Sequence, residues 1–153
     1  MANICFVSLK IECRSKRAAL KVNAVLTQLS EAAAQQRKGF YAGSDRYIFD
    51  AAFYVYEKNV SMSYWVKWGY SDEEVIALIN FFNEIAPLKS LLLRYEESGS
   101  LEYGEYMYSA GTLSCRELPI SHYPDATDSD SDQERLQEAF ELYGTIRIIS
   151  QWQ

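Results

Sequence analysis

The stretch that decides the fold runs from Asn59 to Gly111 and reads NVSMSYWVKWGYSDEEVIALINFFNEIAPLKSLLLRYEESGSLEYGEYMYSAG. Apolar residues alternate with polar ones near both of its ends, as in half-buried strands, and recur every three or four residues in its middle, as in a helix. The pattern predicts a strand (Val60–Trp68), a helix (Ser71–Ala86), a strand (Leu88–Tyr95), a turn (Glu96–Gly99) and a strand (Leu101–Tyr108).

The helix has clear signals at both of its ends. Ser71 and Glu74 have the spacing of a capping box, in which each side chain accepts a hydrogen bond from the other residue's backbone N–H. Pro87 prevents the helix from continuing, because proline lacks a backbone N–H and its ring clashes with the preceding turn. The side chains expected to face the core are Val75, Leu78, Ile79, Phe82 and Ile85.

The residues before Asn59 predict a related series of elements. Ile4–Cys13 alternates as a strand, and Ser15 is a suitable N-cap for a helix that reaches about Arg37. Tyr47–Tyr56 reads as a strand that a short polar turn joins to Val60–Trp68, so the two are expected to form an antiparallel hairpin. The resulting order, β-α-β-β-α-β, predicts an α+β fold of the ferredoxin-like kind, with two helices on one face of an antiparallel sheet.

The rest of the chain predicts additions to this unit. Leu101–Tyr108 and Thr112–Leu118 read as an added β-hairpin, which completes a ferredoxin-like domain over residues 1–118. Residues 119–132 form an acidic linker. Residues 133–153 read as a C-terminal helix and strand packed on the same domain, with Leu136, Phe140 and Tyr143 on one side of that helix.

Composition restricts the class of protein. The 153 residues are 48% hydrophobic, enough for a core, and the net charge is −6. Residues 1–58 carry nine Lys or Arg against five Asp or Glu, whereas residues 119–153 carry two against seven. An acidic total argues against broad nucleic-acid binding, which needs clustered cations. No apolar run is long enough to cross a bilayer and no signal peptide is evident, so the expected location is the cytoplasm, without membrane association.

One basic segment is a candidate anion-binding site. Arg14, Lys16, Arg17 and Lys21 fall at the start of the first predicted helix, where the helix dipole is already positive. Backbone N–H groups and cations at such a position can bind a phosphate or another anion. The alternative interpretation is a solvated basic end, since charge runs usually form solvated faces.

No set of residues for catalysis or metal binding stands out. The sole histidine, His122, lies in a proline-flanked loop, and the three cysteines form no CxxC pair. Asp128, Asp130 and Asp132 open like a calcium loop, but Gln133 stands where glycine is required, and the closing glutamate is also missing. The sequence therefore predicts a non-enzymatic protein with no cofactor and no metal.

Aromatic and acidic residues of the second half form the candidate binding surface. Tyrosine and tryptophan are favoured at protein interfaces because they combine apolar area with a hydrogen-bonding group. Aromatic residues on an open sheet face can instead stack the bases of single-stranded nucleic acid, which is the alternative reading. The residues predicted to contact a protein partner are Trp65, Glu96, Glu97, Glu102, Tyr103, Glu105 and Tyr106.

Several short motifs resemble those of small phage- and plasmid-borne proteins of unknown function. Those proteins open with an Asn-x-Cys strand and later carry a tryptophan-bearing strand, an aromatic-x-Glu-x-Gly turn and an aromatic-Gly step. The corresponding residues here are Asn3-Ile4-Cys5, Trp65 and Trp68, Tyr95–Gly99, Tyr103-Gly104 and Gly111. The family usually has a tryptophan where Ile4 stands, and the acidic tail lies outside its pattern. The resemblance implies a mobile-element origin and a ferredoxin-like fold, and it supplies no catalytic residues.

Together these features predict a non-enzymatic interaction protein of phage or plasmid origin that acts in the cytoplasm of a host bacterium. Its sharpest form is an inhibitor of a nucleic-acid-binding defence complex, of the anti-CRISPR or anti-restriction type, whose acidic surface would occupy a basic groove of a host protein. Self-association into a homodimer, through an open sheet face or an edge strand, is a further expectation. The alternative is a module that binds single-stranded nucleic acid through an aromatic sheet face.

Overall fold

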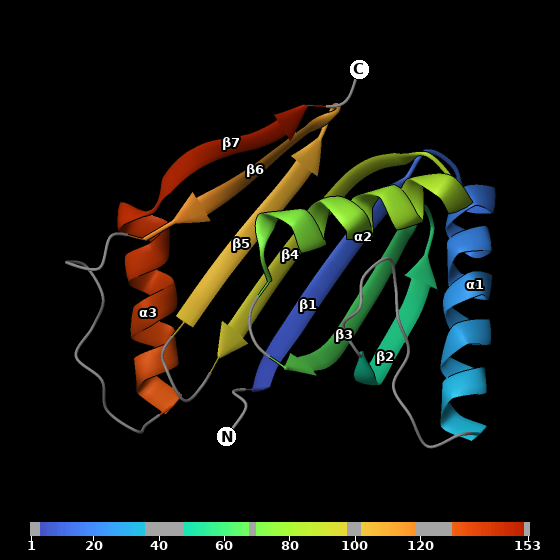
Figure 1. Cartoon of the computed structure of the whole chain (residues 1–153), viewed down its shortest axis with the longest axis horizontal. Coiled ribbons are helices and arrows are strands. Elements are labelled where there is room, and N and C mark those ends of the chain that lie inside the picture. Colours follow the sequence, from blue (N-terminus) through green and yellow to red (C-terminus); the bar gives the residue numbers. More distant parts are fainter. Residues whose placement is uncertain (1–3, 36–47, 68–69, 98–101, 119–129, 152–153) are drawn as a thin grey trace.

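The computed structural model describes residues 4–35, 48–67, 70–97, 102–118 and 130–151. In this part of the chain three helices and a seven-stranded antiparallel sheet make an α+β fold, with strand order β2-β3-β1-β4-β5-β6-β7 (Figure 1). The elements are β1 (Ile4–Cys13), α1 (Lys16–Gln35), β2 (Phe49–Tyr56), β3 (Asn59–Lys67), α2 (Asp72–Ile85), β4 (Leu88–Glu97), β5 (Glu102–Ser109), β6 (Thr112–Glu117), α3 (Asp130–Tyr143) and β7 (Thr145–Gln151).

The core lies between the sheet and helices α1 and α2. Strand β1 is flanked by β3 and β4, and its alternation places every second side chain in this core, so that Leu9 lies opposite Met62 on one side and Leu93 on the other. The predicted capping box of α2 is confirmed: Glu74 N donates to Ser71 Oγ at 3.3 Å, and Ser71 N donates to Glu74 Oε1 at 3.4 Å. The helix ends at Ile85, before Pro87, as predicted.

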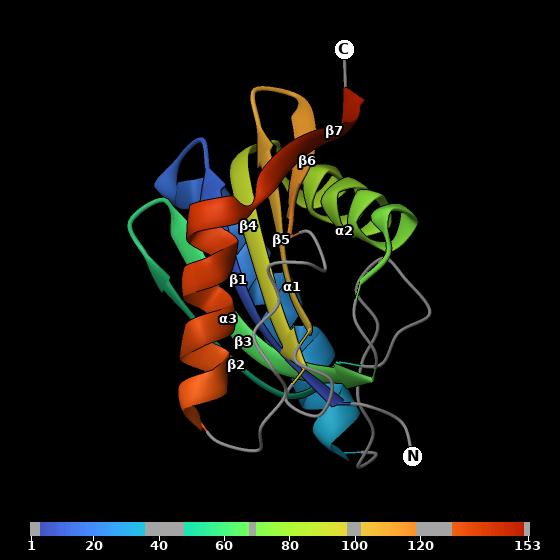
Figure 2. The same cartoon turned by 90° about the vertical axis from the view of Figure 1, so that its left-hand side faces the viewer.

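Helix α3 packs on the opposite face of the sheet. Figure 2 shows α2 and α3 on either side of the strands. A second, small core of Tyr103, Leu118, Leu136 and Phe140 holds α3, with the rings of Tyr103 and Phe140 edge to face at 4.7 Å between centroids. Tyr143, predicted on the same side as Leu136 and Phe140, is 51% exposed and does not belong to this small core.

Strand β4 and helix α3 extend beyond their predicted bounds. Strand β4 continues through Glu96 and Glu97, which were predicted in a turn, because β1 pairs along one side of this segment and β5 along the other. Helix α3 starts at Asp130, inside the predicted acidic linker. The remainder of the linker (119–129), the end of the predicted turn (98–99), the first residue of the next predicted strand (Leu101) and Trp68 lie outside the described residues.

Candidate functional site

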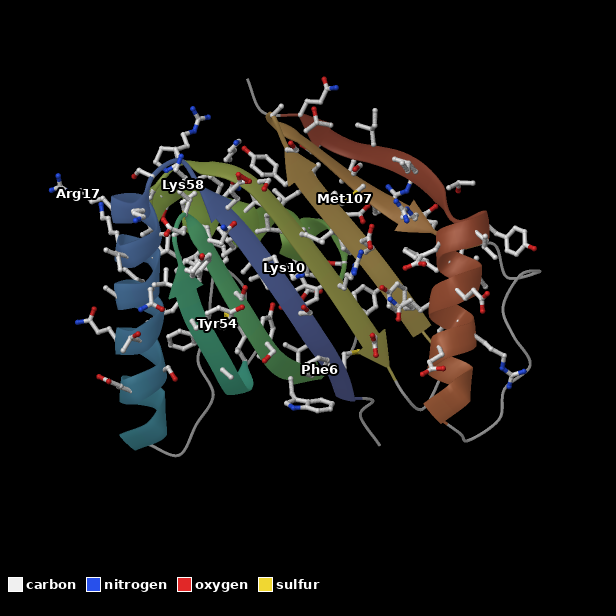
Figure 3. All side chains as sticks on the ribbon, turned by 180° about the vertical axis from the view of Figure 1, so that it is seen from behind. Phe6, Lys10, Arg17, Tyr54, Lys58 and Met107 are labelled. Atoms are coloured by element: carbon white, nitrogen blue, oxygen red, sulfur yellow. The ribbon has the colours of Figure 1, made fainter. Side chains whose placement is uncertain are left out.

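The face of the sheet turned away from α1 and α2 exposes aromatic rings over β1, β2 and β3. Phe6 and Trp65 lie opposite each other in the β1–β3 pairing, with ring centroids 5.2 Å apart, and each is 37% exposed. Tyr54 and Tyr56 on β2 are 65% and 69% exposed. We call these four residues the aromatic face, and Figure 3 looks onto the side of the sheet that carries Phe6 and Tyr54.

Small side chains leave a groove within the aromatic face. The pairing registers align Ser8, Ser63 and Ala52 in a row across three strands, next to the row that contains Phe6 and Trp65. The following row consists of Lys10, Ser61 and Tyr54. These two rows line a depression of about 250 Å³. The groove therefore lies beside the Phe6–Trp65 pair, and the Lys10 and Tyr54 side chains form part of its lining.

Charged groups near the aromatic face are mixed in sign. Glu96, which is half-buried, lies opposite Phe6 in the β1–β4 pairing. Glu12 pairs with Lys89, at 3.2 Å between Oε1 and Nζ. Lys10 adds one cation on the other side of the groove. Arg94, opposite Ser8 in the β1–β4 pairing, is a further cation on this face, and its guanidinium group pairs with Glu105. The described cations of this face are thus interspersed with carboxylates, whereas phosphate contacts need clustered free cations.

The predicted acidic and aromatic site does not form one surface. Glu105 is only 3% exposed, and its carboxylate accepts from Arg94 Nε at 2.7 Å, with Arg116 at 4.0 Å on its other oxygen. Tyr103 is buried beneath α3, and this burial raises the pKa of its phenol. Tyr106 lies on the opposite face, in the main core.

Two of the other four members of that predicted site, Trp65 and Glu96, lie on the open side of the sheet. Trp65 belongs to the aromatic face, and Glu96 pairs with Tyr103 at the end of the β4–β5 ladder. Glu97 and Glu102 form the last pair of this ladder, and their side chains lie outside the described set. Binding by Trp65 and Glu96 stays a prediction, whereas Glu105 adds no accessible charge to any surface.

A polar network on the helix-covered face was not anticipated from the sequence. Tyr106 donates from its hydroxyl to Asp72 Oδ1 at 3.1 Å. Arg147 donates through both terminal nitrogens to Asp72, at 3.1 and 3.3 Å, and through Nε to Glu117 at 2.8 Å. Asp72 and Arg147 are 75 residues apart, so no local pattern could have paired them.

The polar network of Asp72, Tyr106, Glu117 and Arg147 links α2, β5, β6 and β7. A cavity of about 310 Å³ adjoins it, lined in part by Tyr106, Cys115 and Arg147. Burial raises the pKa of Tyr106, with further contributions from Tyr95 and Asp72, and burial also raises the pKa of the Cys115 thiol. Both groups are therefore protonated at neutral pH, and neither acts as an ionised nucleophile or base. The ion pairs instead tie β7 to α2 and β6.

Two further cations, Lys58 and Lys89, lie near the basic segment and were not predicted from the sequence. Arg14, Lys58 and Lys89 line a cavity of about 690 Å³, near the start of α1. Figure 3 shows Arg17 and Lys58 at this same end of the molecule. Ser15 caps α1, since its Oγ accepts from Ala18 N at 3.1 Å.

An acidic side chain already pairs with one of the basic residues at the start of α1. Lys16 pairs with Glu57 at 2.9 Å, and both side chains are largely exposed. Arg17 and Lys21 are exposed on the helix. The structure thus gathers the basic residues at one end, and anion binding there stays a prediction.

Three comparisons with known proteins identify no relative: no protein-family model, curated protein or solved structure shows significant similarity to the chain. Within the described ranges, no three His, Cys, Asp or Glu side chains are grouped so that they could hold a metal ion. None of the described helices is both long and apolar enough to cross a membrane.

Proposed function

We propose that this protein is a non-enzymatic interaction protein that binds a partner protein through its aromatic face. The observation that carries the proposal is the exposed Phe6–Trp65 pair, next to a groove of small side chains and the exposed tyrosines Tyr54 and Tyr56. Rigid aromatic side chains on strands supply large contact area at low conformational cost. A groove beside them can accept a protruding side chain of the partner.

Charge favours a protein over a nucleic acid as the partner. Phosphate contacts require several accessible cations, yet Glu96 lies directly beside Phe6, and the chain carries a net charge of −6. A protein surface with basic and apolar groups would complement Glu96 and the aromatic rings together. The more specific proposal is a mobile-element protein that blocks a basic, nucleic-acid-binding defence complex of a host bacterium. It is supported by the motif resemblance and the acidic total, and Glu105 contributes nothing to it because it is buried.

We further propose that the first six elements form a ferredoxin-like unit. The support is their chain order, β1-α1-β2-β3-α2-β4, together with the strand order β2-β3-β1-β4 within the larger sheet. In this reading, strands β5, β6 and β7 extend the sheet beyond β4, and α3 covers the extension from the other side. The aromatic face is then the uncovered face of the ferredoxin-like unit.

The test is capture of a partner by tagged protein from a bacterial lysate, with matched surface variants. Tyr54→Ala and Tyr56→Ala alter exposed rings of the aromatic face, and Leu20→Ala alters an exposed apolar residue of α1 as the control. We expect wild type and Leu20→Ala to retain the same protein, and the two tyrosine variants to lose most of it. Equal retention by all four proteins would refute binding through the aromatic face.

Single-stranded nucleic-acid binding is the second candidate, favoured by one observation. Phe6 and Trp65 lie on adjacent strands of the open face, near the end of the β1–β3 ladder, where they could stack bases. Titration with single-stranded RNA and DNA, followed by tryptophan fluorescence, separates the two proposals. Binding that weakens steeply with salt and disappears in Trp65→Ala would favour the nucleic acid over the protein partner.

A further inference from the structure

Strand β7 forms one edge of the sheet and has a neighbour on one side. Six of its seven residues pair with β6, the register shifts at Ile149, and no other described strand pairs with it. The outer edge therefore presents a row of backbone N–H and C=O groups toward a further strand. Soluble proteins normally protect such edges with charged side chains, proline, bulges or a covering element, because an open edge pairs readily with another chain.

Apart from the register shift at Ile149, β7 has little of this protection. Ile146 and Ile148 are 61% and 63% exposed on the face opposite to α2, and Leu142 exposes a further apolar side chain at the end of α3. Arg147 is the one charged residue of the strand, and it points to the other face, where Asp72 and Glu117 hold its guanidinium group. The ion pairs of Arg147 with Asp72 and Glu117 join β7 to α2 and β6, so the edge is held in a position from which it can pair.

We propose that the occupant of this edge is a second copy of the chain, which pairs antiparallel along β7 and joins two sheets into one. The arrangement is self-complementary. In a register centred on Arg147, Ile146 of each copy lies opposite Ile148 of the other on one face, and such apolar cross-strand pairs are stabilising. On the other face, each guanidinium group retains its own two carboxylates, so no uncompensated positive charges meet.

Pairing of β7 with a second β7 differs in symmetry from pairing of β7 with β2, the strand at the other edge of the sheet. Pairing of β7 with β7 is isologous and closes after two copies, whereas pairing of β7 with β2 is heterologous and extends into open fibres. Pairing of a seven-residue strand, with a few apolar contacts beside it, buries less area than a typical stable interface of about 1,200–2,000 Å². We therefore expect a concentration-dependent dimer with a dissociation constant on the order of micromolar, rather than an obligate one.

Sedimentation velocity from sub-micromolar to millimolar concentration tests the proposal without reference to any other partner, so its result is independent of the proposed function. The variants are Ile146→Lys and Ile148→Lys, separately and combined, and Leu20→Lys is the matched control, because Leu20 is an equally exposed apolar residue on α1. We expect wild type and Leu20→Lys to form dimers, and the combined edge variant to weaken dimerisation at least tenfold, with an unchanged circular dichroism spectrum.

Three outcomes would overturn the proposal. Wild-type protein that stays monomeric over the whole range would show that the β7 edge does not self-associate. Dimers that persist in the combined edge variant, or that are lost in Tyr54→Lys instead, would place the interface elsewhere. Growth beyond dimers without saturation would indicate heterologous pairing of β7 with β2.

Discussion

Replacement of Gly104 by alanine tests how the tyrosine cluster is packed. Gly104 lies opposite Tyr95 in the β4–β5 pairing, and a Cβ atom added at Gly104 would lie 2.2 Å from Tyr95 Cε1. The backbone of Gly104 is not among the positive-φ positions, so alanine meets no conformational penalty there. The whole cost of Gly104→Ala therefore comes from displacing the Tyr95 ring.

The magnitude follows from the contacts of that ring. Tyr95 stacks on Tyr106 and is tilted against Tyr70, at 6.5 Å between centroids in each case. Aromatic pairs contribute about 0.5–1.5 kcal/mol each, so loss of both costs roughly 1–3 kcal/mol. Alanine recovers about 0.5–1 kcal/mol relative to glycine in a strand. The middle of each range gives an expected net loss of about 1 kcal/mol, or a fall in Tm of roughly 2–4 °C for a domain of this size.

The assay is urea unfolding followed by circular dichroism, for Gly104→Ala, Tyr95→Ala and the double variant. If the ring is the obstacle, Gly104→Ala destabilises the wild type but not the Tyr95→Ala background. The cycle then gives a coupling of about 1–3 kcal/mol, because the gain from alanine cancels between the two backgrounds. An equal loss in both backgrounds, or no loss in the wild type, would refute the reasoning.

Three further predictions concern α3, the buried carboxylate and alkaline pH. Phe140→Ala removes a side chain of the small core and should lower the free energy of unfolding by about 3–5 kcal/mol, with α3 detaching first. Hydrogen exchange should then be faster in the amides of α3, while those of β1 stay protected. A uniform loss of protection would contradict this prediction. Glu105→Gln leaves Arg94 and Arg116 without their carboxylate and should cost about 1–3 kcal/mol in urea unfolding, whereas Glu96→Gln, the control, should change stability little. The pKa of Tyr106 is raised above its ordinary value of 10.0, mainly by burial, so the folded state holds its proton longer than the unfolded state. Stability should therefore fall as pH rises above 10, and Tyr106→Phe should reduce this slope in denaturation measured from pH 8 to 11; an unchanged slope would speak against it.

Local patterns of the sequence predicted most of the elements because each depends on near neighbours. The alternation of Ile4–Cys13 defined β1 and its buried side, and the Ser71–Glu74 spacing defined the start of α2. The single antiparallel sheet followed from the order of these elements. Boundaries at strand ends were less accurate, since Glu96 and Glu97 continue β4 only because strands on both sides pair with them.

The candidate site depended on contacts that the sequence does not encode locally. Trp65 was found from the sequence, but its cross-strand pairing with Phe6 and the groove beside them required the register of three strands. Likewise, Lys58 and Lys89 join Arg14 only because a hairpin turn and the start of β4 meet the end of β1. Sequence reasoning missed these residues because each is an ordinary charged or apolar side chain until its neighbours are known.

By itself the sequence determined the secondary structure, the α+β class and the separation of a basic front from an acidic back. Only the tertiary structure decided which aromatic and acidic side chains reach the surface. Tyr103, Glu105 and Tyr106 lie on the same strand, and all three are buried. Tyr103 packs against α3, Tyr106 lies in the main core and donates to Asp72 of α2, and the carboxylate of Glu105 pairs with two arginines. The physical reason is that alternation along a strand assigns side chains to two faces, whereas burial of each face depends on which distant helix packs against it.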